Sequence, residues 1–416
     1  METVAVTGLG VVTGDYLGAE EQFLALYNGE STIKKDARLS VLGIDNVVSS
    51  PISKSVISKL KDKYNISSEY SHECNYIAFD AVTQAVNSAR IKVDSLKKAG
   101  LFFGINKLFP NNQDLNILWD VYQNKNISAE ERKHVLQRLE YLNPDKVSDY
   151  LSSRLGLEGP ISVFGDACAA GAAAITSGYR RIQQGQLDIA ICGAAEIGTQ
   201  PIMQLLFTKL GATSNTVFPT PEQTSRPFDK DRAGCVLADA AAFLILENAE
   251  HAKRRGKQPL AYIRGAARQI ESYKLTATNP DGSLYRDCIE MALADAKLPP
   301  DAIDHISAHG TSTVSNDQAE SRAIASLFPD STSVTSTKSA LGHSLAASGA
   351  IEAVLSVLCI AKQQVLPTLN FSESKPEEPS LNIVKQGSPQ IINHILSNSF
   401  GFGGENCCLI FSKEGP

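Results

Sequence analysis

Cys168 is the residue of this 416-residue chain best placed for nucleophilic chemistry. A short apolar run at 161–164 predicts a strand, and Cys168 follows after a short turn. The run of Ala and Gly after the cysteine predicts a helix whose side chains are small. A thiol in the first turn of a helix faces unpaired N–H groups and the positive end of the helix dipole, which favour the thiolate. The alternative is a buried structural cysteine, which is common.

Two histidines stand in patterns that could serve the same chemistry. His309 follows an apolar run and precedes Gly-Thr-Ser-Thr, so it should project at the end of a strand, where α/β proteins place ligand sites. The hydroxyls of this run suit an amide-bearing substrate, and the acceptors at 316–320 can cap the following helix and order the loop. A lone histidine is more often a satisfied core or surface residue, so the second histidine motif carries more weight.

That second motif places Lys338 five positions before His343, among small residues. We expect His343 at a helix start, where the dipole disfavours imidazolium and keeps the ring neutral and able to donate an N–H. Glu352, in an apolar helical pattern, could pair with a buried Lys338. The alternatives are a surface lysine and an exposed helix glutamate.

Residues 398–404, Asn-Ser-Phe-Gly-Phe-Gly-Gly, lie between two predicted strands near the C-terminus. Glycines there would let the backbone approach a ligand closely and offer N–H groups to an oxyanion. Taken alone, the segment also fits an ordinary glycine-rich turn.

The composition excludes several classes of protein. The chain is 43% hydrophobic and 20% charged, with a net charge of −6, which argues against a nucleic-acid-binding protein. Its eight cysteines show neither zinc spacing nor a disulfide-framework pattern. The N-terminus lacks the basic start of a secretory signal, and the apolar stretches look too short to span a bilayer. We therefore expect a cytoplasmic protein with reduced thiols, no metal and no membrane contact.

Short β-branched runs alternate with helical patterns, which indicates an α/β protein. Residues 164–175 and 333–351 share a plan of strand, turn and small-residue helix, and residues 4–8 resemble 261–265. These echoes predict two similar halves with their small-residue helices back to back in the core.

We place the boundary between the halves so that 1–252 carries Cys168 and 253–416 carries both histidines. Segment 105–150 is polar and predicts an insertion with solvated helices, and 370–389 predicts a surface loop.

Together the motifs resemble the β-ketoacyl-acyl carrier protein synthases, above all the type II elongating enzymes (KAS II) and their ketosynthase relatives in polyketide pathways. The resemblance covers nearly the whole chain. The matching stretches are Val4–Gly10, Ala167–Gly171, Ser225–Arg232, His309–Thr313, Lys338–His343 with Glu352, and Asn398–Gly404. It implies a thiolase fold, with duplicated halves in a five-layered α-β-α-β-α sandwich, and usually a homodimer.

The resemblance also implies a role for each matching residue. Cys168 would carry the acyl chain, and the backbone N–H groups of Cys168 and Phe402 would form the oxyanion hole. His309 and His343 would hold the malonyl thioester and promote decarboxylation, with Lys338 orienting them and Glu352 as its partner. Phe402 would also act as the gate to the acyl pocket. Substrate-binding positions would be Thr311, Thr313, Phe400, Gly401 and Gly403, the two threonines binding the phosphopantetheine arm.

Several positions depart from the usual pattern of that family. Asp166 and Glu405 stand where threonine is common, and Gly234–Ala240 replaces Gly-Phe-Val-x-Gly-Glu-Gly, with Cys235 at the Phe and Asp239 at the Glu. If it pointed inward, Asp166 would oppose thiolate formation. These differences favour a specialised type II polyketide or polyene pathway. A housekeeping KAS II of fatty acid synthesis and a non-elongating partner subunit remain open. A malonyl decarboxylase is disfavoured because the cysteine is kept.

The resemblance implies an acyl carrier protein as partner, with the substrates carried on its phosphopantetheine and no other cofactor. Because carrier proteins are acidic, the docking face should be basic, and the candidates are Lys59, Lys61, Lys63 and Lys209. An ordinary solvated face explains each lysine equally well. The assembly would be a homodimer or a ketosynthase heterodimer.

Overall fold

The computed structural model describes residues 1–38, 45–66, 72–108, 119–123, 128–130, 133, 140 and 142–415. Half of the insertion predicted at 105–150 lies outside the described residues. The rest folds into two halves of matching topology, each built on a five-stranded core of mixed sheet. The N-terminal strands are, in sheet order, β6 (Ile161–Phe164), β5 (Gly100–Gly104), β7 (Ile189–Ile197), β8 (Leu237–Asn248) and β1 (Val4–Thr13). The matching C-terminal strands are β11 (Ser333–Thr335), β10 (His305–Ser307), β15 (His394–Phe400), β16 (Glu405–Ser412) and β9 (Ala261–Ile270).

The two half-sheets join where β1 pairs antiparallel with β9, with Val4 opposite Ile263 and Val6 opposite Ala261. These are the segments that the sequence echo at 4–8 and 261–265 linked, so the echo marks equivalent strands that meet at the centre of the molecule. Short strands extend the framework: β2 (Tyr16–Leu17), β3 (Lys34–Lys35), β4 (Val48–Ser50), β12 (Gln364–Val365), β13 (Asn382–Ile383) and β14 (Ser388–Pro389). The last two lie within the predicted surface loop 370–389.

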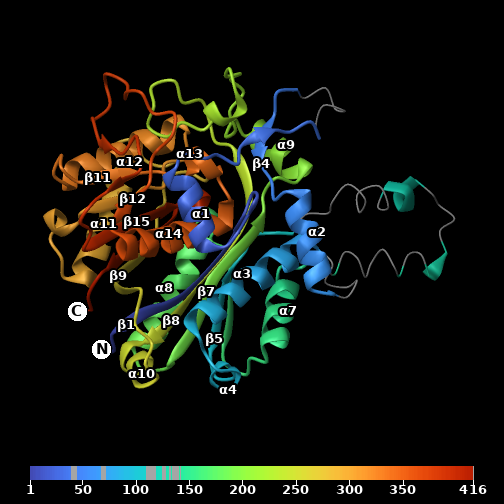
Figure 1. The fold of residues 1–416 in the computed structure, drawn as a ribbon. Coiled ribbons are helices and arrows are strands. Elements are labelled where there is room, and N and C mark those ends of the chain that lie inside the picture. Colours follow the sequence, from blue (N-terminus) through green and yellow to red (C-terminus); the bar gives the residue numbers. More distant parts are fainter. Residues whose placement is uncertain are drawn as a thin grey trace.

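Helices α8 (Ala170–Gln183) and α14 (Ser348–Lys362) pack against each other between the half-sheets (Figure 1). Their approach depends on small residues. A Cβ at Gly171 would lie 2.9 Å from the backbone N of Ala350, and one at Gly349 would lie 2.9 Å from the backbone N of Ala172. The prediction of two small-residue helices back to back is therefore confirmed.

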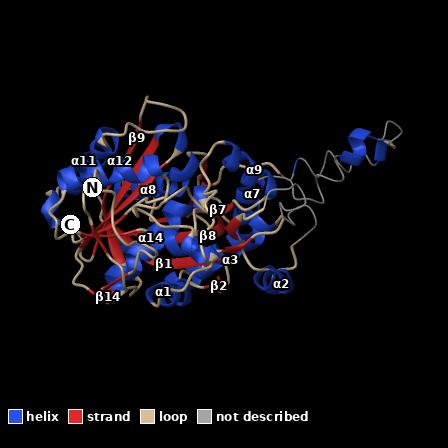
Figure 2. Cartoon of the chain, turned by 90° about the horizontal axis from the view of Figure 1, so that it is seen from above, coloured by secondary structure: helices blue, strands red, loops and turns tan. Residues whose placement is uncertain are grey.

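In both halves, an outer helix packs closely on the sheet at a glycine of the strand beneath it. Helix α3 (Glu73–Ala89) packs on β1 so closely that a Cβ at Gly10 would overlap the carbonyl oxygen of Ala81, and α11 (Ser283–Ala296) approaches β9 at Gly265 in the same way. Figure 2 shows helices on both sides of the strands, which completes the expected α-β-α-β-α order. The remaining helices are α1 (Ala19–Tyr27), α2 (Lys54–Lys63), α4 (Val93–Leu96), α7 (Asp145–Leu155), α9 (Pro201–Lys209), α10 (Ala249–Arg254), α12 (Val314–Leu327) and α13 (Lys338–Leu341).

Each central helix is entered through a short 3₁₀ turn with one residue in the left-handed region. Ala167 (φ 47°) opens the turn Ala167–Ala169 before α8, and Leu345 (φ 49°) opens Leu345–Ala347 before α14. Such a φ is unfavourable for a residue with a side chain and is tolerated where the surroundings enforce it. The two halves therefore share a constrained turn at the same place.

One described stretch, Leu345–Lys362, is long and apolar enough to cross a membrane. The expectation that no apolar stretch reaches that length was therefore wrong. However, 89% of the stretch is buried inside the protein, because α14 lies in the middle layer.

Candidate active site

Cys168 lines an open pocket of about 570 Å³. The thiol is in the 3₁₀ turn before α8, one turn earlier than the sequence predicted, and the residue is only 5% exposed. The pocket is also lined by His309, His343 and the glycine loop 400–404. Residues more than 200 positions apart in the chain thus face one space.

Burial raises the pKa of the Cys168 thiol to about 12, although the charge of Lys338 and a backbone hydrogen bond from Phe402 act in the opposite direction. The resting group is therefore the thiol, not the thiolate that the helix dipole led us to expect. Its sulfur lies 3.2 Å from Nε2 of His343, which can accept the thiol proton.

His343 is held between α13 and the turn before α14. Its backbone N–H donates to the Val236 carbonyl at 2.6 Å, and its Nδ1 lies 2.9 Å from the Ser348 hydroxyl. Burial and the charge of Lys338 lower the pKa of this histidine well below its usual value, so the ring is neutral as expected. The cause is burial and a neighbouring cation, however, and the residue is not at a helix start.

Lys338 connects the histidines to a buried carboxylate. Its Nζ lies 3.3 Å from Nδ1 of His309, donates to the His309 carbonyl at 2.6 Å and forms a short ion pair with Glu352. Burial, then Lys338 and His343, lower the pKa of His309 well below its usual value. The two imidazole rings lie edge to face with centroids 5.3 Å apart. Lys338 and Glu352 are therefore buried rather than at the surface. Lys338 holds His309 in position, and Glu352 pairs with the charge of Lys338.

Two acidic residues of α12 fix the loop that follows His309. The carboxylate of Glu320 accepts the N–H groups of His309 and Gly310, both at 2.8 Å, and that of Asp317 accepts the Thr311 N–H at 3.0 Å. The loop is thus tied to the start of α12, as the acceptors at 316–320 predicted.

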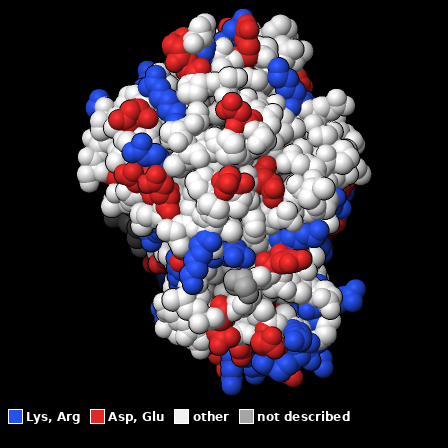
Figure 3. All heavy atoms as spheres, turned by 90° about the vertical axis from the view of Figure 1, so that its left-hand side faces the viewer, with Lys and Arg blue, Asp and Glu red and all other residues white. Residues whose placement is uncertain are grey.

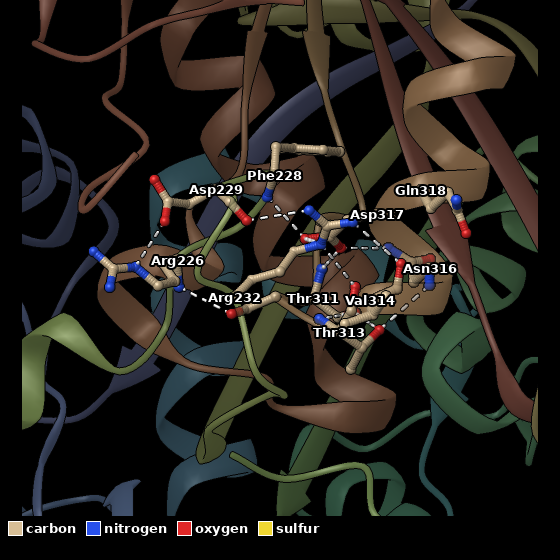
Figure 4. Close-up of polar contacts among 12 residues, drawn as sticks. Arg226, Phe228, Asp229, Arg232, Thr311, Thr313, Val314, Asn316, Asp317 and Gln318 are labelled. Atoms are coloured by element: carbon tan, nitrogen blue, oxygen red, sulfur yellow. Dashed lines mark hydrogen bonds and ion pairs between the residues drawn. The ribbon is translucent and has the colours of Figure 1, made fainter. Parts of the chain in front are cut away.

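Figure 4 shows how the Ser225–Arg232 segment supports that loop. Asp317 also accepts the Phe228 N–H at 2.8 Å, and the guanidinium of Arg232 lies 3.8 Å from the Asp317 carboxylate. Arg232 further donates to the Thr313 carbonyl at 3.4 Å. The side-chain oxygens of Thr311 and Thr313 lie 2.8 Å apart, and both residues line the pocket.

The glycine loop lies against the backbone of the nucleophile. A Cβ at Gly401 would lie 3.2 Å from the Cys168 backbone N and 3.1 Å from the Asp166 carbonyl oxygen, so any larger residue there would have to displace this backbone by a few tenths of an ångström. Gly403 donates to the Leu275 carbonyl at 2.7 Å, which joins this loop to the loop at 272–276. The ring of Phe402 stacks on Phe207 with centroids 6.0 Å apart at the pocket mouth.

The unusual acidic residues do not point at the thiol. Asp166 pairs with Arg268 at 2.6 Å, and Arg268 also lies 3.6 Å from Glu405. Asp166 and Glu405, the two acidic residues at positions where the family usually has threonine, therefore share one arginine. Asp239 accepts the Ile52 and Thr199 N–H groups at 3.1 and 2.8 Å and does not line the pocket. These carboxylates therefore hold neighbouring segments in place.

Glu196 is a further buried carboxyl near Cys168 that does not line the pocket. It accepts the Asn106 N–H at 3.3 Å and a hydrogen bond from the Ala346 backbone, and burial raises its pKa to about 8. The charge of Glu196 in turn raises the pKa of Cys168.

The candidate docking lysines are exposed but do not line the pocket. Lys59, Lys61 and Lys63 lie on α2, where Lys63 pairs with Asp80 at 2.8 Å, and Lys209 ends α9, two residues after the pocket residue Phe207. Lys274 does line the pocket. On the face over the C-terminal half, Figure 3 shows Lys and Arg interspersed with Asp and Glu.

Some pocket residues carried no signal in the sequence. Tyr285 stacks on Phe400 with ring centroids 3.7 Å apart, and Glu271 accepts a hydrogen bond from Thr278 at 3.0 Å. Both lie in segments whose pattern indicates only secondary structure. In the described part of the chain, no group of three or more His, Cys, Asp or Glu side chains is placed to hold a metal ion.

Family models match the chain over most of its length: a β-ketoacyl synthase N-terminal domain at residues 1–252 and a β-ketoacyl synthase C-terminal domain at 260–372. The 3-oxoacyl-[acyl-carrier-protein] synthase 2 of Synechocystis is 40% identical over 62% of this chain, and the match spans 63% of that protein. A putative mitochondrial 3-oxoacyl-[acyl-carrier-protein] synthase of Schizosaccharomyces pombe is 32% identical over 99% of both chains.

Solved structures of ketosynthases are similar to this structure over the whole length of the chain. A type II polyketide ketosynthase in complex with its acyl carrier protein, AntDE:AntF, matches with a TM-score of 0.86 and 29% identity over 99% of both chains. The ishigamide ketosynthase/chain length factor matches with a TM-score of 0.87 and 28% identity over both chains in full.

Proposed function

This chain belongs to the β-ketoacyl synthase family, and from that premise we propose that it is an acyltransferase that catalyses decarboxylative Claisen condensation of an acyl thioester with malonyl-acyl carrier protein. The observation that carries the proposal is the 3.2 Å contact between the Cys168 sulfur and His343 Nε2, in a pocket that His309 also lines. A buried thiol beside a neutral imidazole is an arrangement for activating a nucleophile.

In the first half-reaction, the sulfur of Cys168 attacks the acyl thioester carbonyl while its proton passes to His343 Nε2. The carbonyl oxygen becomes an oxyanion, to which the N–H groups of Cys168 and Phe402 would donate. The bond to the carrier sulfur then breaks, and the leaving thiolate takes the proton from His343. The products are acyl-Cys168 and the free thiol of the carrier.

In the second half-reaction, a malonyl thioester occupies the space between the histidines. The carbon–carbon bond to its carboxylate breaks, CO₂ leaves, and the electron pair forms an enolate whose oxygen accepts hydrogen bonds from His309 and His343. The enolate carbon attacks the acyl group on Cys168, and the sulfur leaves as a thiolate, which takes up one proton from the solvent. The β-ketoacyl chain, longer by two carbons, remains on the carrier.

The hydrogen-bond network suits both half-reactions. The Ser348 hydroxyl can accept from His343 Nδ1 or donate to it, so Nε2 can accept a proton in the first and donate in the second. Lys338 and Glu352 would position His309, and Thr311 and Thr313 would bind the phosphopantetheine arm. The proposal needs no other cofactor and no metal.

We place the enzyme in a specialised type II polyketide or polyene pathway of the cytoplasm. The departures at Asp166, Cys235 and Asp239 and the likeness to two polyketide-type structures support this. The complete set of Cys168, both histidines and Lys338 favours an elongating enzyme over a non-elongating partner subunit. The carrier would dock near the pocket mouth, where Lys209 and Lys274 are exposed, and the assembly would be a homodimer or a ketosynthase heterodimer.

Intact-protein mass spectrometry tests the proposal. The protein is incubated with acyl carrier proteins bearing saturated, polyenoic and β-keto chains, and malonyl carrier is then added. We expect an adduct on the wild type and on Cys359→Ala, a buried thiol outside the pocket whose pKa is likewise raised to about 12, and none on Cys168→Ala. An adduct retained by Cys168→Ala, or no adduct from any chain, would overturn it.

A further inference from the structure

Tyr285, in the first turn of α11, reaches the catalytic pocket from an outer helix and is buried there. Its ring stacks on Phe400, with the two planes 10° apart and the centroids 3.7 Å apart. Burial, then the charges of Glu271 and Glu320, raise the pKa of Tyr285 well above its usual value, so the hydroxyl keeps its proton and can donate. The side chain therefore makes two separate links, one through its ring and one through its hydroxyl.

The link through the ring leads to the imidazole of His309. Phe400 contacts both residues: its ring stacks on Tyr285 and meets the His309 ring edge to face, with centroids 6.0 Å apart and planes 67° apart. All three side chains are buried. Stacked and edge-to-face pairs are preferred arrangements of aromatic rings, so the position of one ring restrains the next. Tyr285 thus limits how far Phe400, and with it the His309 ring, can shift.

The link through the hydroxyl leads to the backbone of His309. The Tyr285 hydroxyl donates to Oδ1 of Asn316 at 3.2 Å. The Asn316 amide in turn donates to the neighbouring Asp317 carboxylate at 3.0 Å (Figure 4) and to the Glu320 carboxylate at 3.4 Å. These two carboxylates accept the N–H groups of His309 and of the two residues after it. Tyr285 therefore restrains the same histidine at its ring and at its backbone.

His309 depends on this orientation only in the proposed second half-reaction. Its Nε2–H would donate to the malonyl carbonyl oxygen as that atom becomes an enolate oxygen, and such a bond is effective when the donor is already aimed. The contact from Lys338 to Nδ1 restrains one side of the ring, and Phe400 restrains another. In the first half-reaction the proton of Cys168 passes to His343 instead, so acylation does not need a fixed His309.

We propose that Tyr285 is a positioning residue for His309, whose ring it holds through Phe400 and whose backbone it holds through Asn316. The inference rests on the proposed condensing function and adds to it a residue that serves decarboxylation but not acylation of Cys168. Loss of the Tyr285 side chain should therefore slow one half-reaction and spare the other.

The two half-reactions can be measured separately on the full chain. One rate is CO₂ release from malonyl pantetheine, and the other is acylation of Cys168 by octanoyl pantetheine. Tyr285→Leu removes both links, whereas Tyr285→Phe keeps the stacked ring. Tyr76→Leu is the matched control, because Tyr76 is a buried tyrosine of the outer helix α3 and lies outside the pocket.

We expect Tyr285→Leu to lower kcat for CO₂ release about tenfold, with KM changed less than about threefold and the acylation rate less than about twofold. Tyr285→Phe should keep most of the wild-type rate in both half-reactions. Tyr76→Leu should keep the wild-type ratio of the two rates.

An unchanged ratio in Tyr285→Leu, or equal falls in both rates, would overturn the inference and leave the condensing function standing, since a residue that only fills the core affects both half-reactions alike. A loss in Tyr285→Phe as large as in Tyr285→Leu would also overturn it. If Tyr285→Leu does not fold, Tyr285→Met, with a flexible side chain that fills gaps but has no ring, is judged by the same criteria. A wild type that neither releases CO₂ nor becomes acylated would instead remove the proposed function.

Discussion

Nζ of Lys338 lies 3.3 Å from Nδ1 of His309, and this contact determines which nitrogen of the histidine carries the proton. An ammonium group can only donate, so Nδ1 must accept. Because the ring is neutral, its single proton then resides on Nε2. One lysine thus makes His309 a fixed hydrogen-bond donor rather than a base.

Lys338→Met should separate the two half-reactions. Methionine keeps much of the length of the side chain but removes every donor, so the proton on His309 is no longer confined to Nε2. We expect CO₂ release from malonyl carrier to fall by about 10²-fold or more, with a smaller loss in acylation of Cys168. Lys362→Met at the end of α14 is the matched control. Equal losses in both half-reactions would argue against a role in orienting His309.

The reactivity of Cys168 toward iodoacetamide should rise steadily with pH. Because burial holds the pKa of the thiol at about 12, the thiolate fraction increases about tenfold for each pH unit below that value. The alkylation rate, read by mass spectrometry with Cys168→Ala as the blank, should therefore show no plateau between about pH 7 and 10. A plateau near neutrality would mean that the resting enzyme holds a thiolate.

Glu196 should make the protein less stable in alkali. Its pKa is raised from 4.5 to about 8, so the folded state binds more protons than the unfolded state between these values. Its contribution to stability is therefore fully present below about pH 4.5 and is lost as the pH rises through about 8. Glu196→Gln stays neutral throughout, and its Tm should fall less than that of the wild type between about pH 5 and 9. Glu290→Gln, at an exposed position of α11, should follow the wild type, and parallel curves for all three proteins would refute the assignment.

Two glycines near the nucleophile should differ sharply in their tolerance of a methyl group. Gly401→Ala places a Cβ 3.2 Å from the Cys168 N, so it should push the loop away and lower the acylation rate about tenfold or more. A Cβ at Gly165 would meet no atom closer than 4.0 Å, so Gly165→Ala should acylate like the wild type. Similar rates for the two variants would show that the close approach of the glycine loop is unimportant.

Strong local patterns made much of the fold predictable from the sequence. The echo between residues 4–8 and 261–265 identified the two strands that pair at the centre, and the Ala/Gly runs identified the helices that pack there. Those signals arise from close packing, which restricts residue size at many positions in one segment.

The electrostatics of the site were less predictable, because they depend on burial. The helix position of Cys168 suggested a thiolate, but loss of solvent outweighs the nearby positive charge. Likewise Asp166 could not be placed before Arg268, more than a hundred residues later, was seen to pair with it. Tyr285 and Glu271 reach the pocket only through tertiary packing, which leaves no local pattern.

The matched turns at Ala167 and Leu345 occupy equivalent places in the two halves but carry different chemistry. The turn of the first half presents a cysteine, whereas the same place in the second half holds Ala346, beside the His343 that faces that cysteine. The two halves thus complement each other: the first supplies the sulfur of Cys168 as the nucleophile, and the second supplies Nε2 of His343 as the acceptor of its proton. Neither half carries the full reagent set, so separately produced halves should be inert until they reassociate.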